Sequence, residues 1–415
     1  MAGMKHVIIG NGPAGVIAAE TLRKLDAAAE ITLIGDEAEP PYSRMAIPYL
    51  LAGNIDEQGT HLRKATGHFQ DLRITLQQGR VNKLDAEARQ LTLADGKTLA
   101  YDRLLIATGS KPVRPPGFDL PGVETCWTMA DARRIMTLAQ PGARVLQIGA
   151  GFIGCIVLEA MAKRGVKLTV VEMGDRMVPR MMTEAAGGMI RRWVESKGVK
   201  VHVNAQVASL RAEGKTIVAK LKSGEELTAD LVICAAGVKP NLDFIDGSGL
   251  KVGQGIQVDL SARSNIAEIF AAGDVAEMAD FHSGQPAVNA IQPNAADQAR
   301  VAASNMAGRS ASVAGSLAIN VLDTLGLIST SFGQWWGGEG SESVELADEK
   351  QHRYLSLKFK DEVLIGATSI GWTDHVGALR GLIQGRVRLG EWKQRLLADP
   401  TQFMAAYLGA AQKTA

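Results

Sequence analysis

The sequence predicts an α/β protein that contains two copies of one unit. The first copy begins with HVIIGNGPAGVIAAETLRKL and continues into the apolar run ITLI, and the second begins with RVLQIGAGFIGCIVLEAMAKRG and continues into LTVVE. In each copy an apolar, β-branched run predicts a strand, and the alanine- and leucine-rich stretch after it predicts a helix. Each copy therefore has the order strand, glycine turn, helix, strand.

Each copy is followed by a matching tail, which strengthens the case for duplication. ADGKTLAYDRLLIATGSKP follows the first copy, and KSGEELTADLVICAAGVKP follows the second. In both tails thirteen positions separate the turn glycine from the last glycine, from Gly96 to Gly109 and from Gly224 to Gly237. The Asp-Gly and Ser-Gly pairs near the start of these tails predict hairpin turns, so each tail holds a meander and a final strand. Two such units predict two nucleotide-binding domains, one of them inserted in the other.

The spacing of the glycines in the two strand–helix turns predicts phosphate sites. They are Gly10, Gly12 and Gly15 in the first copy, and Gly149, Gly151 and Gly154 in the second. The first glycine of such a motif makes the tight turn, the second lets the backbone approach a pyrophosphate, and the third allows close packing of helix on strand. The helix N-terminus then faces the anion. A single motif can be a turn with nothing bound, but two in the same context favour two dinucleotide sites.

Carboxylates at the predicted strand ends are candidate ligands of the sugar groups. Glu172 ends LTVVE, 23 residues after the first glycine of its copy, which suits a carboxylate that accepts hydrogen bonds from a ribose 2′-hydroxyl. Asp36 and Glu37 follow ITLIG, where a solvated strand end is an equal alternative for Glu37. Asp274 ends the strand of NIAEIFAAGDVAEM, just before a helix that Pro293 predicts, and it is placed to bind polyol groups unless it is a structural turn residue.

Composition and charge exclude several other classes of function. The chain has 45 Lys+Arg and 44 Asp+Glu, so its net charge of +1 gives no support for nucleic acid or an anionic membrane surface as a partner. Cys126, Cys155 and Cys234 lie far apart, so no zinc knuckle, iron–sulfur cluster or redox-active dithiol is predicted. We interpret them as small core residues. The seven histidines make no HxxxH pair, so no metal site is predicted.

No apolar stretch reaches 18 residues, and a strand that starts near Met4 leaves no room for a signal peptide. The sequence therefore predicts a cytoplasmic location and no membrane segment.

These motifs resemble the family of FAD/NAD(P)-dependent pyridine-nucleotide oxidoreductases. The matching segments are GNGPAG, PPYSR, LLIATGSKP, GAGFIG, VVEMGDR, AAGVKP and IFAAGDVA, between residues 5 and 308. The resemblance implies an α/β fold with two Rossmann-like three-layer domains, one for FAD and one for NAD, plus an α+β C-terminal domain. The implied boundaries are 1–113 and 243–316 for the FAD-binding domain, 114–242 for the NAD-binding domain and 317–415 for the C-terminal domain.

The resemblance also implies which residues hold each cofactor, and it implies no catalytic side chain. The FAD residues would be Gly10, Gly12, Pro13, Ala14, Gly15, Asp36, Glu37, Arg44, Val81, Thr108, Gly109 and Asp274. The NAD(H) residues would be Gly149, Gly151, Ile153, Gly154, Glu172 and Gly237. Asp36 and Glu37 would face the adenosine ribose of FAD, Arg44 its phosphate–ribityl region and Asp274 its ribityl chain, and Val81 would meet the adenine through its backbone.

The sequence departs from the family pattern in an informative way. The thiol-dependent members place a cysteine after the second strand, but PPYSRMAIPYLLAG has none. The stretch is most similar to reductases of rubredoxin and ferredoxins and to the flavin module of NADH-nitrite reductase. Tyr49 and Ile156 stand where the ferredoxin reductases have a lysine and a glutamate, and Gln292 stands where a tryptophan often packs. Paired loss of the two charges avoids a stranded buried charge.

Three functions fit this resemblance. The first is an FAD-dependent NADH:acceptor oxidoreductase that passes electrons between NAD(H) and an external rubredoxin, ferredoxin or other iron or iron–sulfur protein. The second is the NAD(H)/FAD subunit of a larger iron–sulfur dehydrogenase, such as a 2-oxoacid dehydrogenase complex. The third is a non-enzymatic flavoprotein whose assembly responds to NADH. The neighbours Trp335 and Trp336 are either core residues or part of a docking surface for a partner.

Overall fold

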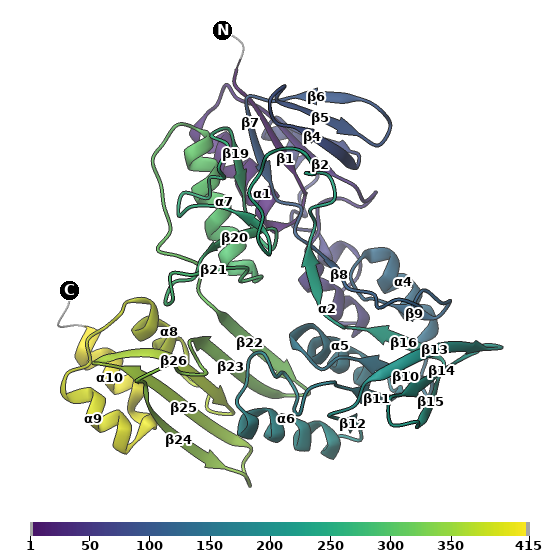
Figure 1. Cartoon of the computed structure of the whole chain (residues 1–415), viewed down its shortest axis with the longest axis vertical. Helices are drawn as coiled ribbons and strands as arrows, with labels where there is room; N and C mark the ends of the chain where they lie inside the picture. The colour runs from purple at the N-terminus through teal and green to yellow at the C-terminus, as the bar shows by residue number, and fades with distance from the viewer. Residues whose placement is uncertain (1–2, 412–415) are drawn as a thin grey trace. The chain divides into compact units, whose positions relative to one another are not determined.

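The computed structural model describes residues 3–411, and its contacts divide the chain into two compact units (Figure 1). The first unit contains the chain up to Leu50, Ile55–Lys111 and Val238–Ser316. The second contains Leu51–Asn54, Pro112–Gly237 and the chain from Leu317 onward. The predicted split of the second unit into an NAD-binding and a C-terminal domain stays a prediction. None of the helices among residues 3–411 is both long and apolar enough to span a bilayer.

The first unit is built on a five-stranded parallel sheet with the strand order β19-β7-β1-β2-β3. Its strands are β1 (Lys5–Ile9), β2 (Glu30–Gly35), β3 (Ile74–Gln78), β7 (Arg103–Ile106) and β19 (Ile269–Ala271). Such parallel sheets are covered on both faces, which explains their continuous apolar runs. The central strand β1 carries its carboxyl end directly into the first glycine turn.

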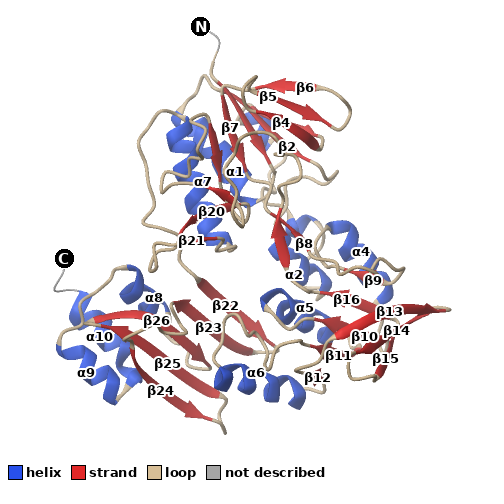
Figure 2. Ribbon diagram, in the orientation of Figure 1, coloured by secondary structure: helices blue, strands red, loops and turns tan. Residues whose placement is uncertain are grey.

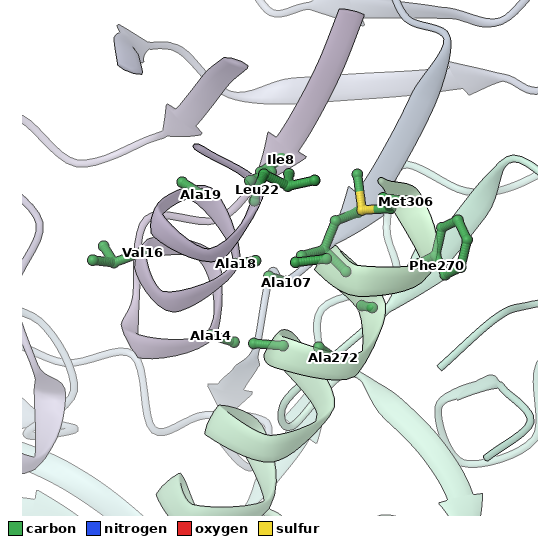
Figure 3. Close-up of a cluster of buried hydrophobic side chains, with 14 of the residues drawn as sticks. Ile8, Ala14, Val16, Ala18, Ala19, Leu22, Ala107, Phe270, Ala272 and Met306 are labelled. Atoms are coloured by element: carbon green, nitrogen blue, oxygen red, sulfur yellow. The ribbon is translucent and has the colours of Figure 1, made fainter. Parts of the chain in front are cut away.

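Two helices cover one face of this sheet, and a second β-layer covers the other (Figure 2). The helices are α1 (Pro13–Leu25) and α7 (Gln292–Met306). Figure 3 shows Ala18 and Leu22 of α1 and Met306 of α7 gathered over Ile8 of β1. The opposite layer is an antiparallel meander of β4 (Val81–Asp85), β5 (Gln90–Leu93) and β6 (Thr98–Ala100). This is the predicted three-layer arrangement, and the predicted helix after Pro293 is confirmed as α7.

Short elements complete the first unit and its connections. They are η1 (Arg44–Ala46), α2 (Ile47–Leu51), η2 (Gln58–Thr60), α3 (His68–Asp71), β8 (Ser110–Pro112), β17 (Val238–Pro240), β18 (Ile256–Gln257), β20 (Ala276–Ala279) and β21 (Pro286–Ala287). β8 and β17 pair with each other in a two-stranded sheet, close to where the chain leaves and re-enters the first unit.

The second unit repeats the plan of the first, which confirms the predicted duplication. Its parallel sheet has the order β12-β11-β10-β16-β9, and its meander is β13-β14-β15. The elements are β9 (Val123–Glu124), α4 (Met129–Leu138), β10 (Arg144–Ile148), α5 (Phe152–Lys163), β11 (Lys167–Val171), α6 (Glu184–Ser196), β12 (Lys200–His202), β13 (Val207–Glu213), β14 (Thr216–Leu221), β15 (Glu226–Ala229) and β16 (Leu231–Cys234). Ile148 pairs with Val171 as Ile9 pairs with Ile34, so Glu172 and Gly35 occupy the same position in the two copies.

The C-terminal part has the predicted α+β character. Five antiparallel strands form a sheet in the order β22-β23-β26-β25-β24, with helices in the same part of the chain. The strands are β22 (Ile319–Thr324), β23 (Leu327–Gly333), β24 (Glu342–Asp348), β25 (Arg353–Lys360) and β26 (Val363–Ile370), and the helices are α8 (Gly377–Gln384), α9 (Glu391–Ala398), η3 (Pro400–Gln402) and α10 (Phe403–Ala411).

Side chains of α6 attach this sheet to the nucleotide-binding part of the second unit. The Trp193 indole N–H donates to the Thr324 carbonyl at 3.0 Å, at the turn between β22 and β23. At the start of α6 the Thr183 hydroxyl bonds the Tyr354 hydroxyl at 2.9 Å. These contacts hold the C-terminal sheet against the same part of the chain that carries the second glycine turn.

Candidate dinucleotide-binding sites

The first glycine turn has a shape that only its glycines allow. Gly10 has φ +106, and a Cβ there would lie 2.1 Å from the Ala107 carbonyl oxygen. A Cβ on Gly15 would lie 1.8 Å from the Gly10 carbonyl oxygen, so this glycine allows α1 to pack against the turn. A Cβ on Gly12, in contrast, would meet no atom within 4 Å. The middle glycine therefore leaves open space at the N-terminus of α1.

The second turn repeats this geometry. Gly149 has φ +100, and a Cβ there would lie 2.3 Å from the Ala235 carbonyl oxygen. A Cβ on Gly154 would lie 2.5 Å from the Gly149 carbonyl oxygen, whereas one on Gly151 would meet nothing within 4 Å. Neither α1 nor α5 has an acidic residue in its first turn. Both turns thus offer open space and unopposed helix N–H groups, which fit a pyrophosphate.

Glu172 lies at the end of β11 and is bound by the backbone of two turns. One carboxylate oxygen accepts the Ala150 N–H at 2.6 Å, and the other accepts the Gly174 N–H at 2.7 Å. The side chain is buried, so its negative charge is fixed beside the glycine turn. Arg176 does not reach this carboxylate, because its guanidinium binds Asp175 and the Met182 carbonyl within its own loop. The predicted contact of Glu172 with a ribose stays a prediction.

The equivalent strand end of the first copy is different. Gly35 takes the position of Glu172, and the side chain of Asn11 lies over it. Asp36 follows and is exposed, while the Glu37 carboxylate binds the Arg44 guanidinium at 2.6 Å. The Glu37 carboxylate also accepts the Tyr42 hydroxyl at 2.7 Å. Glu37 and Arg44, which the sequence assigns to different parts of FAD, are therefore joined in one ion pair.

Asp274 is the half-buried carboxylate of the first unit's site. It follows β19 and accepts a hydrogen bond from the Ser110 hydroxyl at 2.7 Å. Burial raises the pKa of the Asp274 carboxyl above its ordinary value, while the Ser110 hydrogen bond and the positive charge of Arg44 oppose that rise. The influence of Arg44 links the segment PPYSR to the end of β19. A half-buried carboxylate with spare lone pairs fits a polyol ligand.

The remaining predicted residues lie at strand ends and at helix starts. Thr108 and Gly109 follow β7, and Asn241 holds both: its amide donates to the Thr108 carbonyl at 2.9 Å, and its N–H donates to the Gly109 carbonyl. Gly109 and Gly237 both have positive φ, and a Cβ on either would meet nothing within 4 Å. Val81 begins β4 with its side chain in the core, which leaves only its backbone for a ligand. The others lie on the two helix starts: Pro13 and Ala14 on α1, and Ile153 on α5.

The sequence analysis missed three residues that shape these sites. Ser110 binds Asp274, Asn241 clamps the turn after β7, and Asn11 covers Gly35. Ser110 lies within LLIATGSKP and Asn241 directly follows AAGVKP, but nothing in the spacing of either motif marks these contacts. Asn11 lies inside GNGPAG, and comparison with Ala150 in GAGFIG was the available signal.

The three cysteines are buried, which confirms their interpretation as core residues. Burial raises the pKa of the Cys126 thiol to about 12 and that of the Cys155 thiol to about 12. Burial also raises the pKa of Cys234. Thiols with raised pKa values are poor nucleophiles, because the thiolate is the reactive form.

The residues that depart from the family pattern, and the tryptophan pair, differ in their exposure to solvent. Tyr49 is 58% exposed, and Gln292 is exposed at the start of α7. Trp335 is 8% exposed and Trp336 is 60% exposed, with their rings packed edge to face. Trp335 is therefore a core residue, whereas Trp336 is exposed and its part in docking stays a prediction.

We expect Asp274→Asn to weaken FAD binding and to stabilise the protein without FAD. Because the carboxyl has a raised pKa in the fold, it ionises in the unfolded chain first, and this destabilises the fold as the pH rises above the ordinary aspartate range. The Asn variant without FAD should melt at a higher temperature at pH 7, and the difference should shrink toward pH 3. Its affinity for FAD should fall roughly ten- to a hundredfold, the value of a hydrogen bond to a charged group. Equal FAD affinity in both proteins would contradict the ribityl role.

We expect replacement of all three cysteines by alanine to leave NADH-dependent reduction of an artificial dye nearly unchanged. Their side chains are buried and their thiols stay protonated, so the variant loses packing, at about 1 kcal/mol for each small truncation, but no reactive group. Dye reduction and FAD content should be measured together. Loss of turnover with FAD and fold retained would require a thiol mechanism.

Comparison with known proteins gives a family and several relatives. The model of the pyridine nucleotide-disulphide oxidoreductase family matches residues 4–302. The NADH-dependent phenylglyoxylate dehydrogenase subunit epsilon of Aromatoleum evansii is 30% identical over 404 residues, which cover 95% of this chain and 95% of that protein. The ferredoxin–NAD(+) reductase component of the biphenyl dioxygenase system of Paraburkholderia xenovorans is 34% identical over 303 residues, 72% of this chain and 74% of that protein.

Solved structures have the same fold. The covalent complex of putidaredoxin reductase with putidaredoxin contains a chain that superposes with a TM-score of 0.89 at 23% identity, and the match covers 98% of this chain and 99% of that one. At this identity the likeness concerns the fold alone, including the C-terminal sheet.

Proposed function

The chain belongs to the pyridine nucleotide-disulphide oxidoreductase family, and on this premise we propose that it passes electrons from NADH to a separate iron–sulfur protein of the ferredoxin or rubredoxin kind. It is an FAD-dependent NADH:acceptor oxidoreductase, as its relatives are oxidoreductases that use NAD. The main support for this proposal is that all three cysteines are buried and have raised pKa values. With no accessible thiol among these residues to take up electrons, an acceptor outside the chain is the natural outlet.

In this proposal the first glycine turn and Asp274 hold FAD, and the second turn and Glu172 hold NADH. Bound FAD supplies the redox chemistry, because it accepts a hydride from NADH and can release electrons singly. The protein binds and orients both cofactors. The N-terminus of α1 would face the FAD pyrophosphate, and that of α5 would face the NADH pyrophosphate. The N-terminus of α7 would supply a partial positive charge to offset the negative charge of a reduced flavin.

No group of three or more potential metal ligands occurs among residues 3–411, so the proposed iron centre belongs to the partner. The named relative in the biphenyl dioxygenase system is a ferredoxin–NAD(+) reductase, which supports a ferredoxin-type acceptor. We also propose that the protein acts in the cytoplasm.

A second function, as the NAD(H)/FAD subunit of a multi-subunit dehydrogenase, is favoured by one specific observation. The match to the phenylglyoxylate dehydrogenase subunit covers 95% of both chains, whereas the match to the biphenyl ferredoxin reductase covers 72% of this chain. The longer match takes in most of the C-terminal part, where Trp336 is 60% exposed. Exposed tryptophans are frequent at interface centres. In such a complex, electrons would pass between an iron–sulfur subunit and NAD(H).

The test begins with the untagged protein purified from its native host. We expect about one FAD per chain, because one of the two sites is proposed for FAD. The flavin absorbance should bleach on anaerobic addition of NADH. Subsequent reduction of an added ferredoxin or rubredoxin, followed by its own spectrum, would support the free reductase. Copurification of iron–sulfur subunits in fixed ratio would support the complex. A protein that stays colourless after incubation with FAD would contradict both.

A further inference from the structure

In both copies, a side chain fills the space between the glycine turn and the end of the next strand, but it comes from a different residue in each copy. In the second copy the residue after the first glycine is small, Ala150, and the strand-end residue Glu172 extends its carboxylate to the Ala150 N–H at 2.6 Å. In the first copy the corresponding residues are Asn11 and Gly35. A large side chain in the turn thus accompanies a glycine at the strand end, and a small one accompanies a glutamate. The same space is filled from opposite sides.

Contacts at Gly35 show how closely Asn11 fills this space. A Cβ on Gly35 would lie 2.2 Å from the Asn11 Nδ2 and 2.8 Å from its Oδ1, so a side chain at this position would have to displace the Asn11 amide. The Asn11 side-chain amide is half-buried and makes no hydrogen bond with any residue between 3 and 411. An amide without a protein partner is free to bond to a ligand or to water.

We propose that Asn11 is a ligand of the FAD adenosine ribose and takes the place that a strand-end carboxylate has in the second copy. The inference rests on the proposed placement of FAD in the first unit. A strand-end acid of a Rossmann unit binds the ribose hydroxyls, and Gly35 cannot do so. The Asn11 amide occupies that location and can both donate to and accept from a hydroxyl. Of the two acids that follow, Asp36 is exposed, and Glu37 is already bound by Arg44 and Tyr42.

The inference predicts a coupling between Asn11 and the ribose hydroxyls. Apo protein would be titrated with FAD and with an FAD analogue that lacks the adenosine 2′- and 3′-hydroxyls, with quenching of flavin fluorescence as the readout. Native protein should bind FAD about 3- to 10-fold more tightly than the analogue, the range for a net neutral hydrogen bond. Asn11→Ala should bind FAD more weakly by a similar factor and should bind FAD and the analogue almost equally. A full preference for FAD in Asn11→Ala would overturn the inference.

A size exchange gives a second, independent test. Gly35→Glu should lose FAD affinity, because the new side chain must displace the Asn11 amide from the place where it would bind the ribose. The double variant Asn11→Ala/Gly35→Glu reproduces the arrangement of Ala150 and Glu172, so it should bind FAD more tightly than Gly35→Glu alone. A double variant that binds no better than the single variant would show that the two positions are not coupled and would overturn the exchange.

These outcomes separate this inference from the proposed function. Native protein that binds neither FAD nor the analogue would overturn both. Native protein that binds FAD but does not discriminate against the analogue would overturn the role of Asn11 and leave the oxidoreductase intact. Circular dichroism and the affinity of the second unit for NADH should be the same in all variants, because the substitutions lie in the first unit.

Discussion

Replacement of Gly151 by alanine should abolish tight NADH binding while the protein keeps its fold and its FAD. A Cβ at this position meets no protein atom within 4 Å, and the backbone at φ −74 and ψ −170 is ordinary for alanine. The methyl group therefore costs the fold little, but it occupies the space that the coenzyme pyrophosphate requires. We expect Kd for NADH to rise on the order of a hundredfold, equivalent to about 2.7 kcal/mol. The dissociation constant for NADH can be measured by titration calorimetry of the FAD-loaded protein.

The chain offers a matched control for this prediction. Gly12 has the same backbone angles, φ −74 and ψ −171, and a Cβ there is equally free of protein contacts. Gly12→Ala should lose FAD and keep the fold and the NADH site, whereas Gly151→Ala should lose NADH and keep FAD. Gly149→Ala, in contrast, should destabilise the fold, because its Cβ would lie 2.3 Å from a carbonyl oxygen at positive φ. Unaltered NADH affinity in Gly151→Ala would show that the coenzyme does not lie on this turn.

NADH should be preferred over NADPH by about 100- to 1000-fold in kcat/KM, and Glu172 should be the cause. Two unit charges about 4 Å apart at an effective dielectric near 20 repel by roughly 4 kcal/mol, and each 1.4 kcal/mol corresponds to about tenfold. The two backbone hydrogen bonds to the carboxylate prevent it from swinging away from a 2′-phosphate. Screening by solvent lowers the repulsion below the full Coulomb value.

Glu172→Gln should narrow this ratio at least tenfold, mainly through a lower KM for NADPH, because it removes the charge and keeps the size. Some loss with NADH is also expected, since the Gln amide group cannot accept from both the Ala150 and Gly174 N–H groups. Arg176→Gln is the control: its guanidinium is bound within its own loop, so the coenzyme ratio should stay the same. An unchanged ratio in Glu172→Gln would show that this carboxylate does not face the ribose.

The sequence predicted the fold because the duplicated motifs carry their own local physics. Gly10, Gly15, Gly149 and Gly154 are required by carbonyl oxygens within 2.5 Å of where a Cβ would lie, so their spacing implies the strand–turn–helix geometry directly. The order of elements along each copy followed from the same repeat. The contacts that join α6 to the C-terminal sheet had no such signal. Trp193 lies 131 residues from its partner Thr324, and Tyr354 lies 171 residues from its partner Thr183. Neither Trp193 nor Tyr354 belongs to a motif.

The candidate sites could be predicted only where a residue acts through its position on an element. Glu172 and Asp274 end strands, so their locations followed from the strand pattern. Their surroundings did not: Ser110 lies 164 residues from Asp274 in the chain, and the rise in the Asp274 pKa depends on burial that no local pattern reports. The pairing of Glu37 with Arg44 was missed because each residue was assigned to a separate part of the cofactor.

The exchange of size between the two copies restricts how such a duplicated protein can evolve. Starting from Asn11 with Gly35, a glutamate at the strand end must displace the Asn11 amide. The arrangement of Ala150 with Glu172 differs from it at both positions, and residues in contact are commonly coupled in their effects. A single substitution would leave a copy with neither arrangement, so we expect the turn residue and the strand-end residue of each copy to change together.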